Sequence, residues 1–289
     1  MSNKIILVGS GYLGNYIIKN IIENKLPYKI IEVARTKKNR PDRIESITMD
    51  LDSGNLGLEG FENGRIIYMA PPNTASLKDN RVENFLKNLG TVKIKQFIYI
   101  STSGVYGNCN GKEVDETYEV NPGTDRAKRR VSAESQLINY CKQKKISLII
   151  LRVPGIYGKG RLPIDRIKSG EPIIKKEESR VTNLIHVEDL ARLVIAGLKI
   201  DNIGLHEIIN VSDGNPVLST DYYETLSKLL GIKINNYITY REAKNIYTEK
   251  RLSFLNESRV LNIDKMNLML PGCIKHQSLE GGIKASLEL

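Results

Sequence analysis

The sequence predicts an α/β protein: a doubly wound parallel sheet with helices on both faces, followed by a smaller mixed C-terminal portion. Over the first half of its 289 residues, short β-branched runs alternate with segments in which apolar residues recur at helical spacing. The first of these runs leads directly into a Gly-x-Gly-x-x-Gly pattern. From residue 155 the chain becomes rich in Gly, Pro and Lys, which is typical of loops rather than of a sheet core.

The strands of the first half are expected where short apolar runs are bounded by turn residues. They cover residues 4–8, 28–34, 44–49, 65–69, 96–100 and 147–151. Helices are expected directly after the first strand, near residues 82–89 and over about 125–144. Later in the chain, helices at 186–198 and 220–230 enclose a strand at 206–211. We therefore expect a Rossmann dinucleotide-binding domain over residues 1–154, joined by the strand near 206–211, and a smaller substrate-binding portion over 155–289.

Composition excludes several classes of protein. Lys and Arg number 43 against 33 Asp and Glu, a net charge of +10, and the hydrophobic content of 40% is too high for a disordered tail. No apolar run reaches the roughly 18–20 residues of a membrane span, and the first run is too short for a signal peptide. The three cysteines and three histidines are isolated and form no pattern of metal ligands. We expect a cytoplasmic protein with no metal, no membrane contact and no nucleic-acid partner. The positive charge could suit an anionic ligand, but a well-solvated basic surface is the favoured interpretation.

The glycine pattern is typical of a dinucleotide pyrophosphate site. Gly9 would permit a tight turn, Gly11 would let the backbone approach the phosphates, and Gly14 would let the helix pack closely. Tyr12 and Leu13 begin that helix, whose N-terminus carries partial positive charge. Because the pattern follows a strand and precedes a helix, we expect it to bind NAD or NADP.

The end of the second predicted strand bears on the choice between these cofactors. A carboxylate about 20 residues after the motif would hold the ribose of NAD. Ala34 stands there instead, followed by Arg35, whose guanidinium could bind the 2′-phosphate of NADP. Further cations follow at Lys37, Lys38 and Arg40, and a solvated loop is an equal interpretation of them. Glu32 argues for NAD, but the balance favours NADP.

Further motifs recur at the ends of the predicted strands. The segment STSGVYG at residues 101–107 leaves the carboxyl end of the fifth strand, where ligands bind in open α/β sheets. The others are Asp50-Leu51, Ala70-Pro71-Pro72, VDET at 114–117, RVPGIYG at 152–158 and IHVED at 185–189. With these motifs the sequence resembles the extended short-chain dehydrogenase/reductase superfamily, the sugar-nucleotide epimerase and dehydratase group, over nearly the whole chain.

The resemblance implies roles for individual residues. The implied cofactor residues are Asp50 at the adenine, Ala70 and Pro71 at the adenosine, and Leu51, Pro72 and Ser101 beside them. Thr102 would fill the catalytic Ser/Thr position of the family, and it or Ser103 would polarise a carbonyl or hydroxyl group of the substrate.

The central motif of the family, Tyr-x-x-x-Lys, is replaced in this chain. The frame that normally carries it runs Pro122, Arg126, Arg130, Glu134, so arginines occupy the Tyr and the Lys positions. An arginine does not exchange a proton at neutral pH, although Arg130 could still hold a ribose. These departures resemble an atypical, YeeZ-like branch of the superfamily.

Two functions follow as hypotheses. The first is an NAD(P)-binding oxidoreductase or epimerase/dehydratase-like enzyme for a small anionic, possibly sugar-nucleotide, substrate. Arg126 and Arg130 would contact this substrate from one helix face, although a solvated helix face is an equal interpretation of the pair. Tyr106 could replace the missing tyrosine, or simply pack in the structure. The alternative is a non-catalytic NAD(P)-binding redox sensor or partner-binding module. A homodimer is compatible with both.

Overall fold

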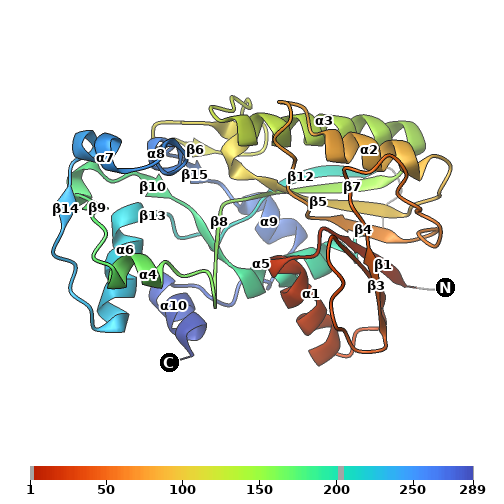
Figure 1. Ribbon diagram of the computed structural model, residues 1–289, viewed down its shortest axis with the longest axis horizontal. Helices are drawn as coiled ribbons and strands as arrows, with labels where there is room; N and C mark the ends of the chain where they lie inside the picture. Colours follow the sequence, from red (N-terminus) through yellow and green to blue (C-terminus); the bar gives the residue numbers. More distant parts are fainter. Residues whose placement is uncertain (1–2, 201–204, 289) are drawn as a thin grey trace.

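A seven-stranded sheet forms the centre of the computed structural model, which describes residues 3–200 and 205–288 (Figure 1). Its strands are all parallel, in the order β12-β7-β5-β4-β1-β2-β3. They span β1 (Lys4–Val8), β2 (Lys29–Ala34), β3 (Ile44–Thr48), β4 (Arg65–Tyr68), β5 (Gln96–Thr102), β7 (Ser147–Val153) and β12 (His206–Asn210). The order runs outward from β1 in both directions, so the predicted Rossmann class is confirmed and the strand order reverses between β1 and β4.

Helices cover both faces of this sheet. The helices α1 (Tyr12–Glu23) and α5 (Val187–Gly197) lie on one face, and α2 (Asn80–Leu89) and α3 (Asp125–Lys144) on the other. Side chains of a strand alternate between the faces, and along β1 Ile5 packs toward α1 and α5 while Ile6 packs toward α2 and α3. This alternation between two apolar layers explains why the strands read as nearly continuous apolar runs.

A mixed portion lies beside the sheet, on the left in Figure 1. It contains the predicted second-half helix α6 (Ser219–Leu230) and many elements too short for periodicity to reveal. These are η1 (Ser103–Tyr106), β6 (Glu113–Val114), β8 (Gly155–Tyr157), α4 (Ile164–Lys168), β9 (Ile173–Ile174), η2 (Lys176–Glu178), β10 (Val181–Thr182), β11 (Leu184–His186), β13 (Val217–Leu218), β14 (Tyr237–Ile238), α7 (Tyr240–Ile246), α8 (Glu249–Asn256), β15 (Val260–Leu261), α9 (Asp264–Met269) and α10 (Leu279–Leu287). The later elements β12, which is a strand of the sheet, and α5 and α9, which pack against the sheet, show that the chain passes between the two portions more than once.

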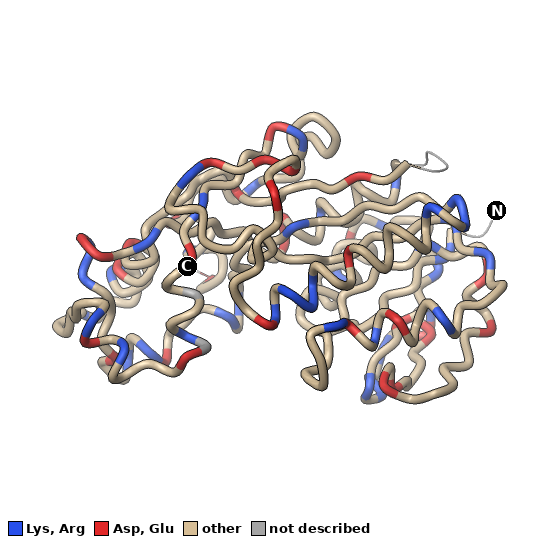
Figure 2. Tube along the Cα trace, turned by 90° about the horizontal axis from the view of Figure 1, so that it is seen from above, with Lys and Arg blue, Asp and Glu red and all other residues tan. Residues whose placement is uncertain are grey.

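Charge is spread over both portions. Figure 2 shows Lys and Arg interspersed with Asp and Glu along the trace, so the net charge of +10 is not gathered in one part of the molecule. None of the helices in the described ranges is long and apolar enough to span a membrane.

Candidate functional site

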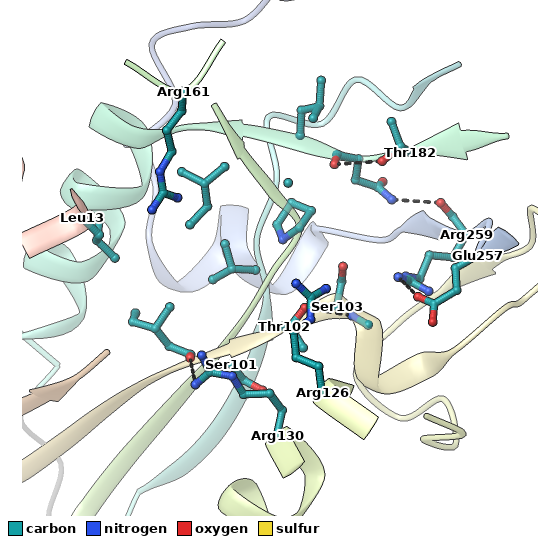
Figure 3. Close-up of a pocket in the computed structure, with 18 of the residues that line it drawn as sticks. Leu13, Ser101, Thr102, Ser103, Arg126, Arg130, Arg161, Thr182, Glu257 and Arg259 are labelled. Atoms are coloured by element: carbon teal, nitrogen blue, oxygen red, sulfur yellow. Dashed lines mark hydrogen bonds and ion pairs between the residues drawn. The ribbon is translucent and has the colours of Figure 1, made fainter. Parts of the chain in front are cut away.

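A cavity of about 690 Å³ opens where the parallel strands end, between the sheet and the mixed portion (Figure 3). The sheet side contributes the glycine loop, the ends of β5 and β7, and the first turn of α3. The other wall comes from segments after residue 155, including Arg161, Thr182 and Arg259. We call this space the main cavity. It lies at the edge of the sheet where ligands of α/β proteins bind.

A second cavity, of about 530 Å³, adjoins the first across the glycine loop. Both are lined by Gly9, Gly11 and Pro71. The remaining walls of this side cavity come from the ends of β2, β3 and β4, and include Arg35, Asp50 and other residues that the sequence analysis assigns to the cofactor. Two cavities joined at a glycine loop match the shape of a dinucleotide, whose two halves meet at a pyrophosphate.

The glycine loop is shaped by close backbone approach. Gly9 has a φ of +75°, and a Cβ atom there would lie 2.5 Å from the backbone of Ala70. A Cβ at Gly14 would lie 2.2 Å from Oγ of Ser10, whereas a Cβ at Gly11 would meet only a carbonyl oxygen at 3.9 Å. Gly9 and Gly14 therefore serve packing, while Gly11 faces open space. Since Gly11, at the N-cap of α1, provides no side-chain cap, the first N–H groups of the helix remain available to an anion.

Glu32 is engaged below this loop. Its carboxylate is fully buried and accepts hydrogen bonds from Ser10 Oγ at 2.6 Å, Lys38 Nζ at 3.2 Å and the Arg40 guanidinium at 2.6–2.7 Å. Burial by itself would raise the pKa of Glu32, but the hydrogen bonds from Arg40, Ser10 and Lys38 outweigh it and lower the pKa to about 2. Glu32 does not line the side cavity, whereas Arg35 and Lys38 do.

Three residues with hydroxyl groups, Ser101, Thr102 and Ser103, line the main cavity at the end of β5. The Oγ1 atom of Thr102 accepts the N–H of Gly104 at 3.2 Å and so starts η1, and Ser103 follows in the same wall. Ser101 points its hydroxyl the other way, onto the buried carboxylate of Glu134, which pairs with Arg152 at 2.8 Å. Thr102 and Ser103 are therefore placed to contact a bound molecule, and the Ser101 hydroxyl is held by the protein.

The two arginines of α3 differ in their contacts. Arg130 donates to the hydroxyl of Tyr99 at 2.9 Å and to the carbonyl oxygen of Ile100 at 3.1 Å, so it is fixed against β5. Arg126, one turn earlier, is exposed and lies beside Ser103 in Figure 3. The protein around the cavity still removes part of the water from the Arg126 guanidinium, and this desolvation, together with the positive charges of Arg130 and Arg259, lowers the pKa of Arg126 against the effect of Glu257.

Three residues of the expected site lie outside both cavities. Tyr106 is buried, its hydroxyl donates to Oδ1 of Asn210 at 2.8 Å, and its ring packs 4.8 Å from the Arg152 guanidinium. These contacts fit the interpretation that Tyr106 packs in the structure. Gly14 acts through its approach to Ser10, and Pro72 lines neither space among the described residues.

The sequence predicted a substrate-binding portion over residues 155–289, but it did not indicate which residues of that portion line the main cavity. Arg161 places its guanidinium 4.1 Å from the ring centroid of Tyr12, and Arg259 pairs with Glu257 at 2.8 Å. Arg180 and Thr182 complete this side. No spacing connects these residues with the glycine motif, and only the cluster of Gly and basic residues near 155–161 hinted at a site there.

The fold also brings together three possible metal ligands that the sequence analysis treated as isolated. Ligand atoms of His186, Glu188 and His276 lie within 4.8 Å of one another. The two imidazole rings are stacked with centroids 3.7 Å apart, so their in-plane lone pairs do not converge on one ion. His186 already accepts the N–H of Glu188 and contacts Ser286 Oγ at 3.1 Å. These contacts describe a packed, hydrogen-bonded cluster.

Comparison with known proteins finds a family match over the middle of the chain. Residues 73–212 match the NAD dependent epimerase/dehydratase family, which confirms the predicted resemblance. A relative in Methanocaldococcus jannaschii named "Putative UDP-glucose 4-epimerase" is 23% identical over 252 residues, covering 78% of this chain and 81% of its own. A conserved protein of unknown function from Silicibacter pomeroyi has a TM-score of 0.83, with 24% identity and 99% of both chains covered. UDP-glucuronic acid 4-epimerase from Bacillus cereus, solved with UDP-glucuronic acid and NAD, has a TM-score of 0.79 at 20% identity, covering 99% of this chain and 98% of its own.

Proposed function

We propose that this protein is an NADP(H)-dependent oxidoreductase or epimerase-like enzyme for a small anionic substrate. The premise is that residues 73–212 match the NAD dependent epimerase/dehydratase family. One observation carries the proposal: the main cavity and the side cavity meet at Gly9 and Gly11, and the main cavity holds Thr102. A dinucleotide that follows this shape would have its adenosine in the side cavity and its nicotinamide near Thr102.

The side cavity supports NADP over NAD. Its described lining includes Arg35, Lys38 and Arg81 but only one carboxylate, Asp50. Glu32, the residue that could favour NAD, is buried against Lys38 and Arg40. A 2′-phosphate would meet cations there, whereas the two hydroxyls of an NAD ribose would find no free carboxylate at the end of β2.

The main cavity has polar groups for the reacting end of a substrate. Bound NADP would supply a nicotinamide that accepts or donates hydride. Thr102 and Ser103 would donate hydrogen bonds to a carbonyl or hydroxyl oxygen, and Arg130 would hold the nicotinamide ribose from its position on Tyr99 and Ile100. Arg126 would bind an anionic group rather than move a proton.

The substrate class follows from charge and from the relatives. Five arginines and one glutamate line the main cavity within the described part of the chain. UDP-glucuronic acid, bound to the Bacillus cereus epimerase, is an anionic sugar nucleotide. A further space of about 660 Å³ adjoins the main cavity at Ile156, Arg161 and Tyr222, and gives a long substrate room to extend into the mixed portion. We therefore favour an anionic sugar nucleotide.

A second function is a non-catalytic NADP-binding sensor. It is favoured by Arg126, which stands where the family has its proton-carrying tyrosine. A sensor needs to bind only the cofactor, whereas an enzyme needs to bind the cofactor and a substrate.

Two measurements separate these functions. Fluorescence titration with NADPH tests the cofactor site, and absence of saturable binding would refute both. The change in nicotinamide absorbance with oxidised NADP and UDP-glucuronic acid then tests catalysis. The double variant Arg126→Tyr with Arg130→Lys restores the family pair. Hydride transfer by the wild type, or gained by this variant, supports an enzyme scaffold, whereas NADPH binding with no transfer in either supports the sensor.

A further inference from the structure

We propose that the part of the main cavity beside Thr102 is a carboxylate site, in which Arg126 and Arg259 bind an acidic group that the substrate carries close to its reacting carbon. The inference rests on the proposed function and deepens it, because it assigns an acid to one end of the substrate. It also gives Arg126 a role that differs from that of the tyrosine which it replaces.

The two guanidinium groups come from distant parts of the chain. Arg126 belongs to the first turn of α3, and Arg259 precedes β15 in the mixed portion. Both line the main cavity, and in Figure 3 their side chains approach the region of Ser103 from different sides. The fold therefore closes this end of the cavity with a cation from each of its two portions.

Arg259 is held in place before any ligand arrives. Its guanidinium donates to the carbonyl oxygen of Gly107 and to Oε2 of Glu257 at 2.8 Å, and its side chain is only 12% exposed. A guanidinium fixed in this way loses little side-chain freedom when it binds an anion. Arg259 is thus preorganised, and Arg126 is the exposed partner opposite it.

Positive charge is in excess at this end. Glu257 is the only carboxylate lining the main cavity among the residues that the structure describes, and Arg259 already binds it. Arg126, Arg130, Arg180 and Arg259 stand around the same space. The mutual repulsion of Arg126, Arg130 and Arg259, which also lowers the pKa of Arg126, would be relieved by one bound anion.

A carboxylate fits better than a neutral group. The guanidinium fork pairs with the two oxygens of a carboxylate through parallel hydrogen bonds. Thr102 and Ser103 line the same cavity and could bind the substrate's hydroxyl or carbonyl group beside that carboxylate. An alcohol in the same place would offer no negative charge to either guanidinium. The site therefore predicts selection of an acid over the alcohol of the same shape.

The test uses the full chain saturated with NADPH and two matched pairs of probes. UDP-glucuronic acid and UDP-glucose differ only in a carboxylate against a hydroxymethyl group, and glucuronic acid and glucose repeat the comparison without the nucleotide. Calorimetry measures the first pair and ligand-observed NMR the second. We expect the acid to bind at least about tenfold more tightly than the alcohol in one or both pairs.

Variants then assign the preference to this site. Arg126→Gln should reduce it to about twofold or less, and Arg126→Lys should retain part of it, because the charge stays while the fork is lost. Lys128→Gln is the matched control: it removes a charge from the same helix turn but lies outside the cavity, paired with Asp125 at 3.6 Å, and should keep the full preference.

Equal affinities within both pairs, no binding of any probe, or a preference that survives Arg126→Gln would overturn the carboxylate site. These outcomes differ from failure of the proposed function, which is absence of NADPH binding in the preceding titration.

Discussion

The guanidinium of Arg161 lies 4.1 Å from the ring centroid of Tyr12, so a residue of the mixed portion covers the first turn of α1. The same contact includes a hydrogen bond from the Tyr12 hydroxyl to the carbonyl oxygen of Lys159 at 2.9 Å. Gly158 permits this approach, since a Cβ there would lie 2.6 Å from the Tyr12 hydroxyl oxygen. The segment that carries Arg161 is thus packed onto the turn where the cofactor phosphates are proposed to bind.

Arg161→Gln should weaken NADPH binding by about tenfold, because the cavity would lose a cation that stacks on Tyr12, next to the proposed phosphate site. Fluorescence titration measures the change. Arg166→Gln is the control, since Arg166 lines the adjoining space but contacts Tyr223 instead of the glycine loop, and it should bind NADPH normally. Equal effects of the two substitutions would mean that only the general positive charge matters.

NADPH should bind more tightly than NADH, because Arg35 and Lys38 line the side cavity while Glu32 is buried. Arg35→Ala should narrow the difference by about 1–2 kcal/mol, the scale of one charge-assisted hydrogen bond. Titrations with both reduced cofactors test this. Lys37→Ala removes a neighbouring charge that does not line the side cavity and should leave the difference intact. A tenfold preference for NADH in the wild type would contradict the assignment.

Gly11→Val and Gly9→Ala should fail in different ways. Gly11 faces open space, so valine should leave the free energy of unfolding nearly unchanged yet abolish dinucleotide binding by filling the place of the pyrophosphate. Gly9→Ala forces a Cβ against Ala70 in a left-handed conformation, and should lower the free energy of unfolding by roughly 1–3 kcal/mol. Urea unfolding and NADPH titration of each variant separate the two effects. Near-normal NADPH binding by Gly11→Val would show that the cofactor does not bind at the glycine loop.

The sheet and the glycine loop could be predicted because their determinants are local. Each central strand is an apolar run, Gly9, Gly11 and Gly14 stand at fixed spacing, and a parallel sheet brings the ends of its strands to one edge. The segments around Thr102 and Asp50 could be placed at that edge for the same reason.

The opposite wall of the site could not be predicted in this way. Arg161 and Arg259 are positioned by strands of two or three residues that pair with distant segments, such as β15 with β6. Strands this short show no detectable periodicity in the sequence. Tyr106 shows the same limit. Its place in STSGVYG left a site role and structural packing both open, and its hydroxyl is directed by Asn210, which lies about a hundred positions later in the chain.

His186 should make the protein lose stability under mildly acidic conditions. It is buried, its ring stacks on His276, and its contacts include Ser286, Tyr157 and the N–H of Glu188. Burial, with the nearby positive charge of His276 and Arg192 opposed by Glu188, lowers the pKa of His186 to about 4 from the ordinary 6.5.

A histidine whose pKa is lowered in the folded state binds a proton at a higher pH in the unfolded chain than in the folded protein, so acid favours unfolding. Stability from His186 is therefore complete above pH 6.5 and decreases as the pH falls from 6.5 toward about 4. Between about pH 7 and about pH 5 this residue should account for a decrease on the order of 2 kcal/mol in the free energy of unfolding. Urea unfolding at the two pH values measures it. His186→Asn keeps an acceptor for the Glu188 N–H and should lose most of this pH dependence, while His206→Asn, in β12, should retain it. An unchanged slope in His186→Asn would show that other groups, such as His276, titrate in its place.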